Sequence, residues 1–342
     1  MRSSRGDRVF ETKATSLDVA KRAGVSQSAV SRVYTKGASV SAKTAEKVRA
    51  AATELGYRPN VLARSLITGK SRMIGLVVAY LDNYFYPDVL EKLSKRLQEE
   101  GYHVLIFMAS QTAGNIDDVL QEILDYQVDG IVMASVAMSS DLAARCRAAG
   151  VPVVLFNRTQ DDDGLSSIAS NNFAGGRKIA EHLLTLNPDR IGYIAGWEGA
   201  STQRDREAGF IAGIGQAPDL REVGDFHMER AQAAARSMFD RDDPPDALFV
   251  ANDHMAFAAL DVMRSELGID VPGEVVVAGF DDAAPSAWPA YDLTTVRQRA
   301  NAMVEETVAA LMVTIENPDA PPRRVEIDGP LIVRRSTQKE AP

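Results

Sequence analysis

The sequence predicts a small all-α head, a short hinge helix and a larger α/β region built from two doubly wound lobes. Two observations predict this fold. Residues 15–59 contain three short amphipathic patterns separated by glycines. From Met73 onward, short runs that are apolar throughout alternate with amphipathic helical stretches. Such runs indicate strands of parallel sheets that are covered by helices on both faces.

The three patterns of the head each begin after a residue that can cap a helix. Thr15 precedes the first pattern and Asp18 follows three residues later, an arrangement similar to a capping box. Ser26 and Ser41 stand at the same place before the second and third patterns. Gly24 is expected to end the first helix, because glycine adopts the left-handed conformation at little cost.

Residues Leu17–Val33 form a helix, a glycine turn and a second helix, which is the helix-turn-helix arrangement. The second helix of such a motif lies in the major groove of DNA, with its first residues at the base edges. Gln27 can form a bidentate pair with adenine, Ser28 is permissive, and Arg32 can reach a guanine or a phosphate. The alternative is a small helical bundle with no role in DNA binding.

The charge of the chain is divided unevenly along its length. The net charge is -9, but residues 1–70 hold 14 Lys and Arg against 5 Asp and Glu, a net of +9. The remainder holds 24 Lys and Arg against 42 Asp and Glu, a net of -18. A polyanion would be attracted to the N-terminal end and repelled by the rest, which suggests nucleic acid binding there. A chance basic surface patch would give the same count.

Membrane and secretion signals are absent from the sequence. No apolar run reaches the roughly 18–20 residues that cross a bilayer. The N-terminus lacks the apolar segment of a secretory signal peptide. Cys146 is the only cysteine, so no disulfide can form within the chain. We therefore expect a cytoplasmic protein with no membrane partner.

Two sets of apolar runs define the two expected lobes. The first set is Ile74–Val78, Val104–Phe107, Gly130–Met133 and Val153–Phe156. The second set is Ile191–Ile194, Ala247–Val250 and Val275–Ala278. In open sheets of this kind, ligands bind at the carboxyl ends of the strands. The residues that follow these runs are therefore the candidates for a ligand site.

Motifs for phosphate binding and for nucleophilic catalysis are absent. The sequence contains no GxxxxGK[ST] loop, no GxGxxG after a strand and no GxSxG. Its four histidines, His103, His182, His227 and His254, show no metal-ligand spacing. We expect no enzyme activity, no catalytic residues, no cofactor and no bound metal.

Several short segments follow one another near the N-terminus: DVAKRAGVS, AVSRV, VSAKT, LGYRPN and ARSL, and then IGLVV. With these segments, residues 15–78 closely resemble the LacI/GalR family of transcription regulators. The resemblance continues more weakly to about residue 335, through NR at 157–158, SNN at 170–172, RDREAGF at 204–210, AND at 251–253, GFDD at 279–282 and LTTV at 293–296. It implies a homodimer that binds near-palindromic operator DNA.

The resemblance also implies how the chain is divided. The expected parts are a flexible tail at 1–14, a helix-turn-helix domain at 15–59, a hinge helix at 60–70 and a ligand-binding and dimerisation domain at 71–335. That last domain is expected to be periplasmic-binding-protein-like, with an N-lobe of about 71–165 and 297–335 and a C-lobe of about 166–296.

The hinge segment Asn60–Thr68 is too short to be a stable helix alone in water, so it needs a partner. In the family this segment folds on operator DNA, and a leucine at the position of Leu66 wedges between base pairs. Ala63 is small enough for close contact between paired hinge helices. Alternatively, Leu66 packs on the larger domain.

The expected DNA contacts combine the head and the hinge: Thr15, Ser26, Gln27, Ser28, Ser31, Arg32, Tyr57, Asn60, Ala63, Arg64 and Leu66. Thr35 stands where many family members have Asn. The pair Gln27–Ser28 predicts no particular operator. The sequence preference on DNA is therefore left open.

The resemblance places the ligand between the lobes, with contacts from both. The candidates follow strands or begin helices: Asn83, Phe85, Tyr86, Asn157, Thr202, Arg206, Phe226, Asn252, Asp253 and Asp281. Asp, Asn and Arg can grip neighbouring hydroxyls while Phe or Tyr covers the apolar face of a sugar, so a carbohydrate is the expected effector. Purine recognition in the family relies on other residues, and the aligned Ala200 is not basic.

Three of these candidates have a second interpretation. Arg206 could pair on the surface with a neighbouring carboxylate. Asp281 could be a turn residue. Asn83 could cap a helix that starts near Pro87.

These expectations describe a repressor that is released from its operator by a sugar or a sugar derivative. Two alternatives stay open. One is a regulator that depends on a corepressor that is not a sugar. The other is a transport-type sugar-binding protein, which would lack the basic head.

Overall fold

The computed structural model describes residues 14–35, 38–58, 70–109, 113–134, 140–160 and 164–338. The chain divides into two compact units, Met1–Ser71 and Arg72–Pro342. Nearly all of the expected tail at 1–14 and of the expected hinge helix at 60–70 lies outside the described residues.

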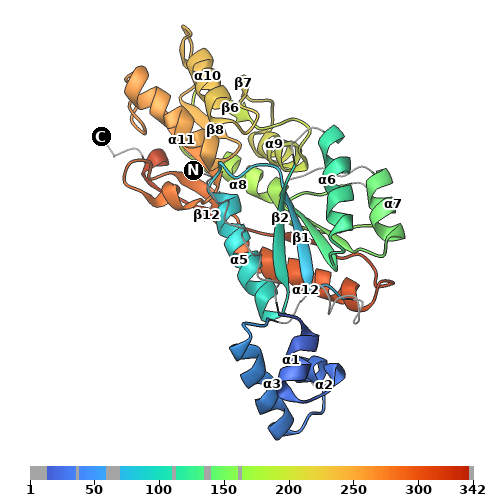
Figure 1. Cartoon of the computed structure of the whole chain (residues 1–342). Helices are drawn as coiled ribbons and strands as arrows, with labels where there is room; N and C mark the ends of the chain where they lie inside the picture. Colours follow the sequence, from blue (N-terminus) through green and yellow to red (C-terminus); the bar gives the residue numbers. More distant parts are fainter. Residues whose placement is uncertain are drawn as a thin grey trace, which may run out of the picture. The chain divides into compact units, whose positions relative to one another are not determined.

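The first unit is a head of three helices around a small apolar core. Its helices are α1 (Ser16–Ala23), α2 (Gln27–Val33) and α3 (Ala42–Glu54) (Figure 1). All three helices contribute to the core: Val19, Ala20, Val30, Val48, Ala51 and Ala52 are buried together. The helix-turn-helix geometry that the spacing predicts is therefore present.

The predicted caps of the head are confirmed. Thr15 and Asp18 form a reciprocal capping box, in which each side chain bonds to the backbone of the other. The hydroxyls of Ser26 and Ser41 each accept a backbone N–H in the first turn of the helix that follows. Gly24 ends α1 with a φ of 66°, a conformation that a residue with a Cβ adopts only with strain.

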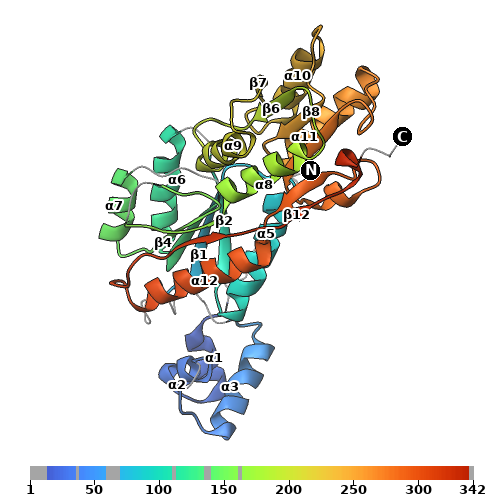
Figure 2. The ribbon, with the colours of Figure 1, turned by 180° about the vertical axis from the view of Figure 1, so that it is seen from behind.

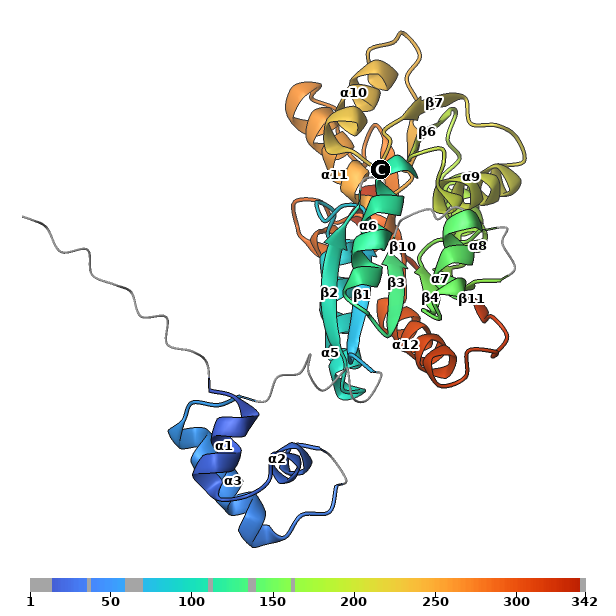
Figure 3. The ribbon, with the colours of Figure 1, turned by 45° about the vertical axis from the view of Figure 1, so that its right-hand side comes forward.

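The second unit begins with a lobe built on a six-stranded parallel sheet. Its strand order is β11-β5-β4-β3-β1-β2, and Figure 3 shows β2, β1 and β3 side by side. The strands are β1 (Met73–Val78), β2 (His103–Met108), β3 (Gly130–Ala134), β4 (Val153–Phe156), β5 (Ser166–Ser170) and β11 (Arg324–Ile327). Its helices are α5 (Phe85–Glu99), α6 (Ala113–Asp125), α7 (Ser140–Ala148) and α12 (Ala300–Glu316).

Both faces of this first sheet are covered, as the apolar runs predict. Ile74, Leu76 and Val78 of β1 belong to a core cluster with residues of α5 and α12. Val77 belongs to a different cluster, with residues of α6 and α7. Because successive side chains of a strand point to opposite faces, this division requires an apolar residue at every position of the strand.

The other lobe has a second six-stranded sheet, with the order β12-β10-β9-β8-β6-β7. Only β12 is antiparallel to its neighbour among the described strands. The strands are β6 (Ile191–Ala195), β7 (Leu220–Val223), β8 (Ala247–Val250), β9 (Val276–Asp281), β10 (Thr294–Arg297) and β12 (Leu331–Ile332). Its α-helices are α8 (Asn172–Leu184), α9 (Ser201–Ile214), α10 (Met228–Phe239) and α11 (Asp253–Asp261), followed by a short π-helix and two short 3-10 helices.

Helices α8 and α9 pack side by side at unusually close range (Figures 1 and 2). A Cβ on Gly176 would lie 2.1 Å from the backbone oxygen of Arg206, and one on Gly209 would lie 1.9 Å from that of Phe173. Only glycine permits this approach. The contact brings the first turn of α8 to the middle of α9.

Three short segments join the two lobes, and they correct the expected lobe boundaries. The chain passes from β5 to α8, returns from β10 to α12, and passes again from β11 to β12. Residues 166–170, expected in the C-lobe, form β5 and pair with β4 and β11 in the N-lobe sheet. Residues 331–332, expected in the N-lobe, form β12 and pair with β10 in the C-lobe sheet. Strands are assigned by the hydrogen bonds that they form, and neither segment gives the signal used: β5 is rich in serine, and β12 is only two residues long.

Across the described part of the chain, no helix is both long enough and apolar enough to cross a membrane.

Candidate functional site

The second helix of the head exposes four of the predicted DNA-contacting side chains: Gln27, Ser28, Ser31 and Arg32. Gln27 Nε2 donates to Ser16 Oγ at 2.9 Å, and the hydroxyls of Ser26 and Ser28 are 2.9 Å apart. These bonds hold the first residues of α2 at the surface, where a helix-turn-helix presents side chains to base edges.

The remaining predicted contacts of the head differ in their surroundings. Thr15 is exposed, and its hydroxyl donates to Asp18 Oδ2 at 2.7 Å, which is part of the capping box. Tyr57 is half-buried, with its ring centroid 6.3 Å from that of Tyr34. Tyr57 therefore also contributes to packing. The other four, Asn60, Ala63, Arg64 and Leu66, lie outside the described residues.

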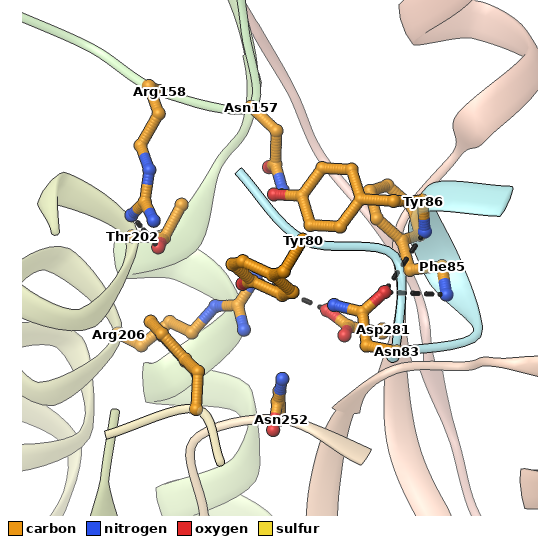
Figure 4. Close-up of a pocket in the computed structure, with 11 residues that line it drawn as sticks. Tyr80, Asn83, Phe85, Tyr86, Asn157, Arg158, Thr202, Arg206, Asn252 and Asp281 are labelled. Carbon is orange, nitrogen blue, oxygen red and sulfur yellow. Dashed lines mark hydrogen bonds and ion pairs between the residues drawn. The ribbon is translucent and has the colours of Figure 1, made fainter. Parts of the chain in front are cut away.

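A polar cavity lies between the two lobes at the carboxyl ends of the strands (Figure 4). Nine of the ten predicted effector residues line it, together with Tyr80 and Arg158: Asn83, Phe85, Tyr86, Asn157, Thr202, Arg206, Phe226, Asn252 and Asp281. The cavity volume is about 10 Å³, which is room for roughly one water molecule. In this arrangement Arg158 and Thr202 bond to each other across the cleft.

A buried ion pair forms the charged part of the cavity. Arg206 Nη2 lies 3.3 Å from Asp281 Oδ1, and the two side chains are only 3% and 5% exposed. The guanidinium also donates to Asn172 Oδ1 at 2.9 Å and to the backbone oxygen of Ala251 at 2.6 Å. It lies over the ring of Phe280, 3.7 Å from the centroid. Arg206 is therefore held by bonds on several sides, and the alternative of a surface ion pair is wrong.

Burial raises the pKa of Asp281 to about 7, although the neighbouring Arg206 opposes the rise. The nearby Asp253 carboxylate contributes in the same direction as burial. Oδ1 of Asp281 accepts hydrogen bonds from both Arg206 and Gln298. The carboxylate of Asp281 thus has one oxygen engaged by the protein and a second oxygen with which it can meet a ligand.

The N-lobe side of the cavity is built from amides and aromatic rings. Asn83 Oδ1 accepts the N–H groups of Phe85 and Tyr86 at 3.1 and 3.0 Å, so it does cap a helix, as the alternative interpretation held. That helix begins at Phe85, two residues before Pro87. The cap uses the oxygen of Asn83 and leaves its amide nitrogen as the group that can meet a ligand.

Asn157 has a buried acceptor that no described residue satisfies. Its Nδ2 donates to the hydroxyl of Tyr86 at 3.1 Å, while its Oδ1 has no hydrogen-bond partner among the described residues. Its backbone φ of 56° is a left-handed conformation that asparagine tolerates better than most residues. A buried polar atom of this kind is costly unless something bonds to it, so Oδ1 is suited to accept from a ligand.

Asn252 and Asp253 are neighbours in sequence but have different roles. Asn252 lines the cavity, and its Oδ1 caps α11 by accepting the N–H of Met255 at 3.1 Å. Asp253 is fully buried and does not line the cavity. The expectation that Asp253 binds the effector is therefore corrected.

The carboxylate of Asp253 is bonded within the C-lobe. It accepts from Ala283 N at 2.9 Å, Ser286 Oγ at 2.6 Å and Thr295 Oγ1 at 2.7 Å. Burial raises the pKa of Asp253 to about 6, although these donors oppose the rise. Asp253 therefore fastens the loop after β9 to the start of α11, behind the wall of the cavity.

Phe226 reaches the cavity because a glycine faces it. A Cβ on Gly196 would lie 2.2 Å from the ring of Phe226, so any larger residue would displace the ring. Phe226 itself has a φ of 61°, and it is buried. The aromatic wall of the C-lobe thus depends on the missing side chain at Gly196 and on the left-handed backbone of Phe226.

Tyr80 and Arg158 are cavity residues that the sequence analysis missed. Tyr80 lies just beyond the end of β1, and Arg158 follows Asn157 just beyond β4. Arg158 Nη1 donates to Thr202 Oγ1 at 2.7 Å and so bridges the two lobes. Both residues follow strands, which was the signal available, but only Asn83, Phe85 and Tyr86 were selected after the first strand and only Asn157 after the fourth.

A metal site or a catalytic dyad finds no support in the described residues. No group of three or more His, Cys, Asp or Glu side chains among them could hold a metal ion. Burial lowers the pKa of His254, and neither of its ring nitrogens has a hydrogen-bond partner in the described part of the chain. Since Asp253 bonds to other groups, it does not activate His254.

Two family models match the chain. "Bacterial regulatory proteins, lacI family" matches residues 15–60, and "Periplasmic binding protein-like domain" matches residues 180–337. The first match covers the head and the second covers most of the C-lobe and the C-terminal part of the chain.

Individual relatives match over nearly the whole length. A sucrose operon repressor of Streptococcus mutans is 31% identical over 307 residues, which is 89% of this chain and 93% of the relative. A transcriptional repressor of Aliivibrio salmonicida named PurR is 29% identical over 335 residues, which is 95% of this chain and 99% of the relative. The solved lac repressor dimer, bound to operator and an anti-inducer, superposes with a TM-score of 0.86 at 27% identity, covering 96% of this chain and 100% of that one.

Proposed function

The chain belongs to the LacI family of bacterial regulatory proteins, and we propose that it is a repressor that a neutral sugar or sugar derivative releases from a near-palindromic operator. The proposal takes the protein to be a homodimer, as the lac repressor in the solved complex is. The observation that carries the effector part is the polar cavity between the lobes, with its buried Arg206–Asp281 pair. The cleft is assigned to binding and not to catalysis.

The hydrogen-bonding groups of the cavity support a polyhydroxylated ligand. Asp281 Oδ2 and Asn157 Oδ1 can accept hydrogen bonds, and the amide nitrogens of Asn83 and Asn252 can donate them. A sugar hydroxyl both donates and accepts, so neighbouring hydroxyls can satisfy both kinds of group. The aromatic residues Tyr80, Phe85, Tyr86 and Phe226 supply the apolar walls.

One observation favours a purine ligand and one opposes it. The similarity to proteins named PurR favours it. The residue at position 200 opposes it. The family resemblance implies that purine recognition needs a basic side chain at this position, whereas Ala200 is apolar, buried and outside the cavity lining. A sugar is therefore the proposed ligand, and a purine is an outcome that the experiment below can reveal.

The small size of the cavity supports the proposal that the ligand releases the repressor from DNA. Ligand pockets usually measure about 300–1,000 Å³, whereas this cavity measures about 10 Å³. A sugar can enter only if the lobes separate or the wall side chains move. It therefore favours a wider cleft, and it shifts the equilibrium by the difference between its affinities for the two arrangements. If the narrow arrangement is the one that holds DNA, the sugar is an inducer.

The test is a titration of operator binding by the full chain. A labelled duplex is first selected from randomised near-palindromes, and its anisotropy is followed in the presence of glucose, sucrose, cellobiose, hypoxanthine or guanine. We expect a neutral sugar to weaken duplex binding at least tenfold. A purine that tightens binding would establish the corepressor alternative, and a chain with no salt-dependent affinity for any duplex would contradict the proposal.

A thermal-shift assay provides an independent measurement of the same ligand. A sugar present at 100 times its dissociation constant stabilises the folded state by about 2.7 kcal/mol. The matched pair of variants is Arg206→Lys, inside the cavity, and Arg204→Lys, on the exposed face of the same helix. Only Arg206→Lys should abolish the shift, because a lysine lacks the planar fork that bonds to several groups at once.

A further inference from the structure

We infer that Asn172 and Gln298 are positioning residues that connect the Arg206–Asp281 pair to two of the three segments joining the lobes. The inference rests on the proposed function, because it concerns how binding in the cavity changes the angle between the lobes. Neither side chain lines the cavity. Each is nevertheless buried and bonded directly to a residue that does.

Asn172 links the N-lobe sheet to Arg206 across the first joining segment. It is the first residue of α8, two residues after the end of β5. Its Nδ2 donates to the backbone oxygen of Ser170 at 2.9 Å, and its Oδ1 accepts from Arg206 Nε at 2.9 Å. One amide group thus bonds to the last residue of an N-lobe strand and to a cavity residue of the C-lobe.

Gln298 makes the corresponding link at the second joining segment. It follows β10, which ends at Arg297, and precedes α12, which begins at Ala300. Its backbone N–H donates to the backbone oxygen of Asp281 at 3.1 Å, and its Nε2 donates to Asp281 Oδ1 at 2.7 Å. Gln298 is therefore hydrogen-bonded to Asp281 through both its backbone and its side chain, so a displacement of one residue moves the other.

The joining segments are also bonded to one another, so they turn together. The backbone N–H of Asn171 donates to the oxygen of Ile327 at 3.0 Å, which joins the first segment to the third. The N–H of Arg297 donates to the oxygen of Pro330 at 2.9 Å, which joins the second to the third. A Cβ on Gly329 would lie only 2.0 Å from the oxygen of Arg297, so the second and third segments are in tight contact.

Hinge motions are absorbed by a few residues at the ends of elements. Asn171 and Arg299 stand next to Asn172 and Gln298, and both have backbone angles outside the helical and strand regions, with φ/ψ of -70°/83° and -79°/69°. A change in these angles would turn the lobes and would move the two amide side chains relative to Arg206 and Asp281.

One buried atom indicates how the links respond to a ligand. Gln298 Oε1 is buried and has no hydrogen-bond partner among the described residues. An unsatisfied acceptor raises the free energy of the narrow arrangement. A sugar hydroxyl that donates to Oδ2 of Asp281 draws negative charge away from Oδ1, and so weakens the bond that Oδ1 accepts from the Nε2 of Gln298. The amide is then able to turn, and a lobe angle that offers its Oε1 a donor becomes more favourable.

The experiment uses two variants of the full chain that break one link each. Gln298→Met keeps the length and shape of the side chain but removes its hydrogen bonds. Asn172→Asp keeps the acceptor for Arg206 but replaces the donor to Ser170 by an oxygen. Gln216→Met, at an exposed position in a loop of the C-lobe, is the matched control.

The measurements are the duplex affinity without sugar, the sugar affinity, and the factor by which saturating sugar weakens duplex binding. Sucrose is the first probe, followed by the other sugars of the panel. For both link variants we expect the duplex affinity to stay within about threefold of the parent chain and the sugar affinity to stay within about tenfold. The weakening factor, by contrast, should fall from tenfold or more to below threefold. Gln216→Met should respond as the parent chain does.

Two results would overturn the inference. One is a full weakening factor in both variants. The other concerns the case in which Gln298→Met or Asn172→Asp loses sugar binding, or loses its fold as seen by circular dichroism. Gln298→Asn, whose shorter amide cannot reach Asp281, is then measured, and an unchanged weakening factor in this variant overturns the inference. If the parent chain itself responds to no sugar, the proposed function fails instead, so the two failures are distinguishable.

Discussion

The two sides of the cavity hold their side chains in different ways. On the C-lobe side, Arg206 and Asp281 are charged, buried and bonded to several other groups of the protein. On the N-lobe side, the buried Arg158 is charged but bonds across the cleft to Thr202, whereas Asn83, Tyr86 and Asn157 are neutral and bond to each other or to nearby backbone. The comparison suggests that the C-lobe fixes the position of a ligand while the N-lobe closes over it.

The largest expected effect follows from breaking the charged side. Replacing Arg206 by Met leaves the Asp281 carboxylate buried without its cation, and breaking a buried pair in this way costs about 3–5 kcal/mol. We expect a marked loss of stability in urea denaturation and at least a hundredfold loss of sugar affinity. Arg204→Met, on the exposed face of α9, is the control and should change both values little. Equal effects of the two substitutions would contradict the difference between the lobes.

The second largest expected effect is a pH dependence of sugar affinity, which arises from Asp281 on the C-lobe side. Because the pKa of Asp281 is raised to about 7, the carboxylate becomes protonated as the pH falls through 7. A protonated Asp281 loses the charge that pairs with Arg206, and its Oδ2 carries a proton where it would otherwise accept from a ligand hydroxyl, so sugar affinity should fall below pH 7 by up to about tenfold per unit. Calorimetric titration between pH 5.5 and 8.5 measures this slope. Asp281→Asn should bind more weakly but with a flat pH profile, and a parent profile that is already flat would refute the prediction.

A third effect tests the closing role of the N-lobe. The ring of Tyr84, which is 51% exposed, lies 6.2 Å from that of Phe257 and 6.3 Å from that of Trp288, and both of these belong to the C-lobe. Aromatic pairs contribute about 0.5–1.5 kcal/mol each beyond their buried area. Tyr84→Ala should therefore favour the wider cleft and tighten sugar binding by up to about tenfold. Weaker binding would show instead that the ring contacts the ligand.

The smallest expected effect is at Tyr86. Tyr86→Phe removes the hydroxyl that accepts from Asn157 Nδ2, and a single neutral hydrogen bond contributes about 1 kcal/mol. Sugar affinity should fall about fivefold, because Asn157 is then free to turn its amide. Tyr126→Phe, at an exposed ring of the same lobe, should leave the affinity unchanged. A loss as large as that of Arg206→Met would contradict the view that the N-lobe only covers the ligand.

The sequence predicted the head and most of the cavity, because both depend on local rules. Thr15, Ser26 and Ser41 cap helices wherever they precede an amphipathic pattern, and the structure confirms each cap. The family resemblance, which implies a ligand between the lobes, together with a search after strands and at helix starts, selected nine cavity residues, since the carboxyl ends of parallel strands meet at one edge.

What the sequence did not predict depends on the contacts that particular side chains make in three dimensions. Asp253 follows a strand as Asn252 does, but its carboxylate bonds to Ala283, Ser286 and Thr295, which are distant in sequence. The positions of β5 and β12 in the sheets were missed because β5 is rich in serine and β12, although apolar, is only two residues long. Only pairing shows which lobe each joins.

The glycine contact between α8 and α9 has a consequence for how this repressor can fail. Any side chain at Gly176 or Gly209 would wedge the two helices apart and draw Arg206 away from Asn172. Such a protein would still carry an intact head. A genetic selection for cells that stay switched off in the presence of the proposed inducer should therefore return substitutions at these two glycines, although neither lines the cavity.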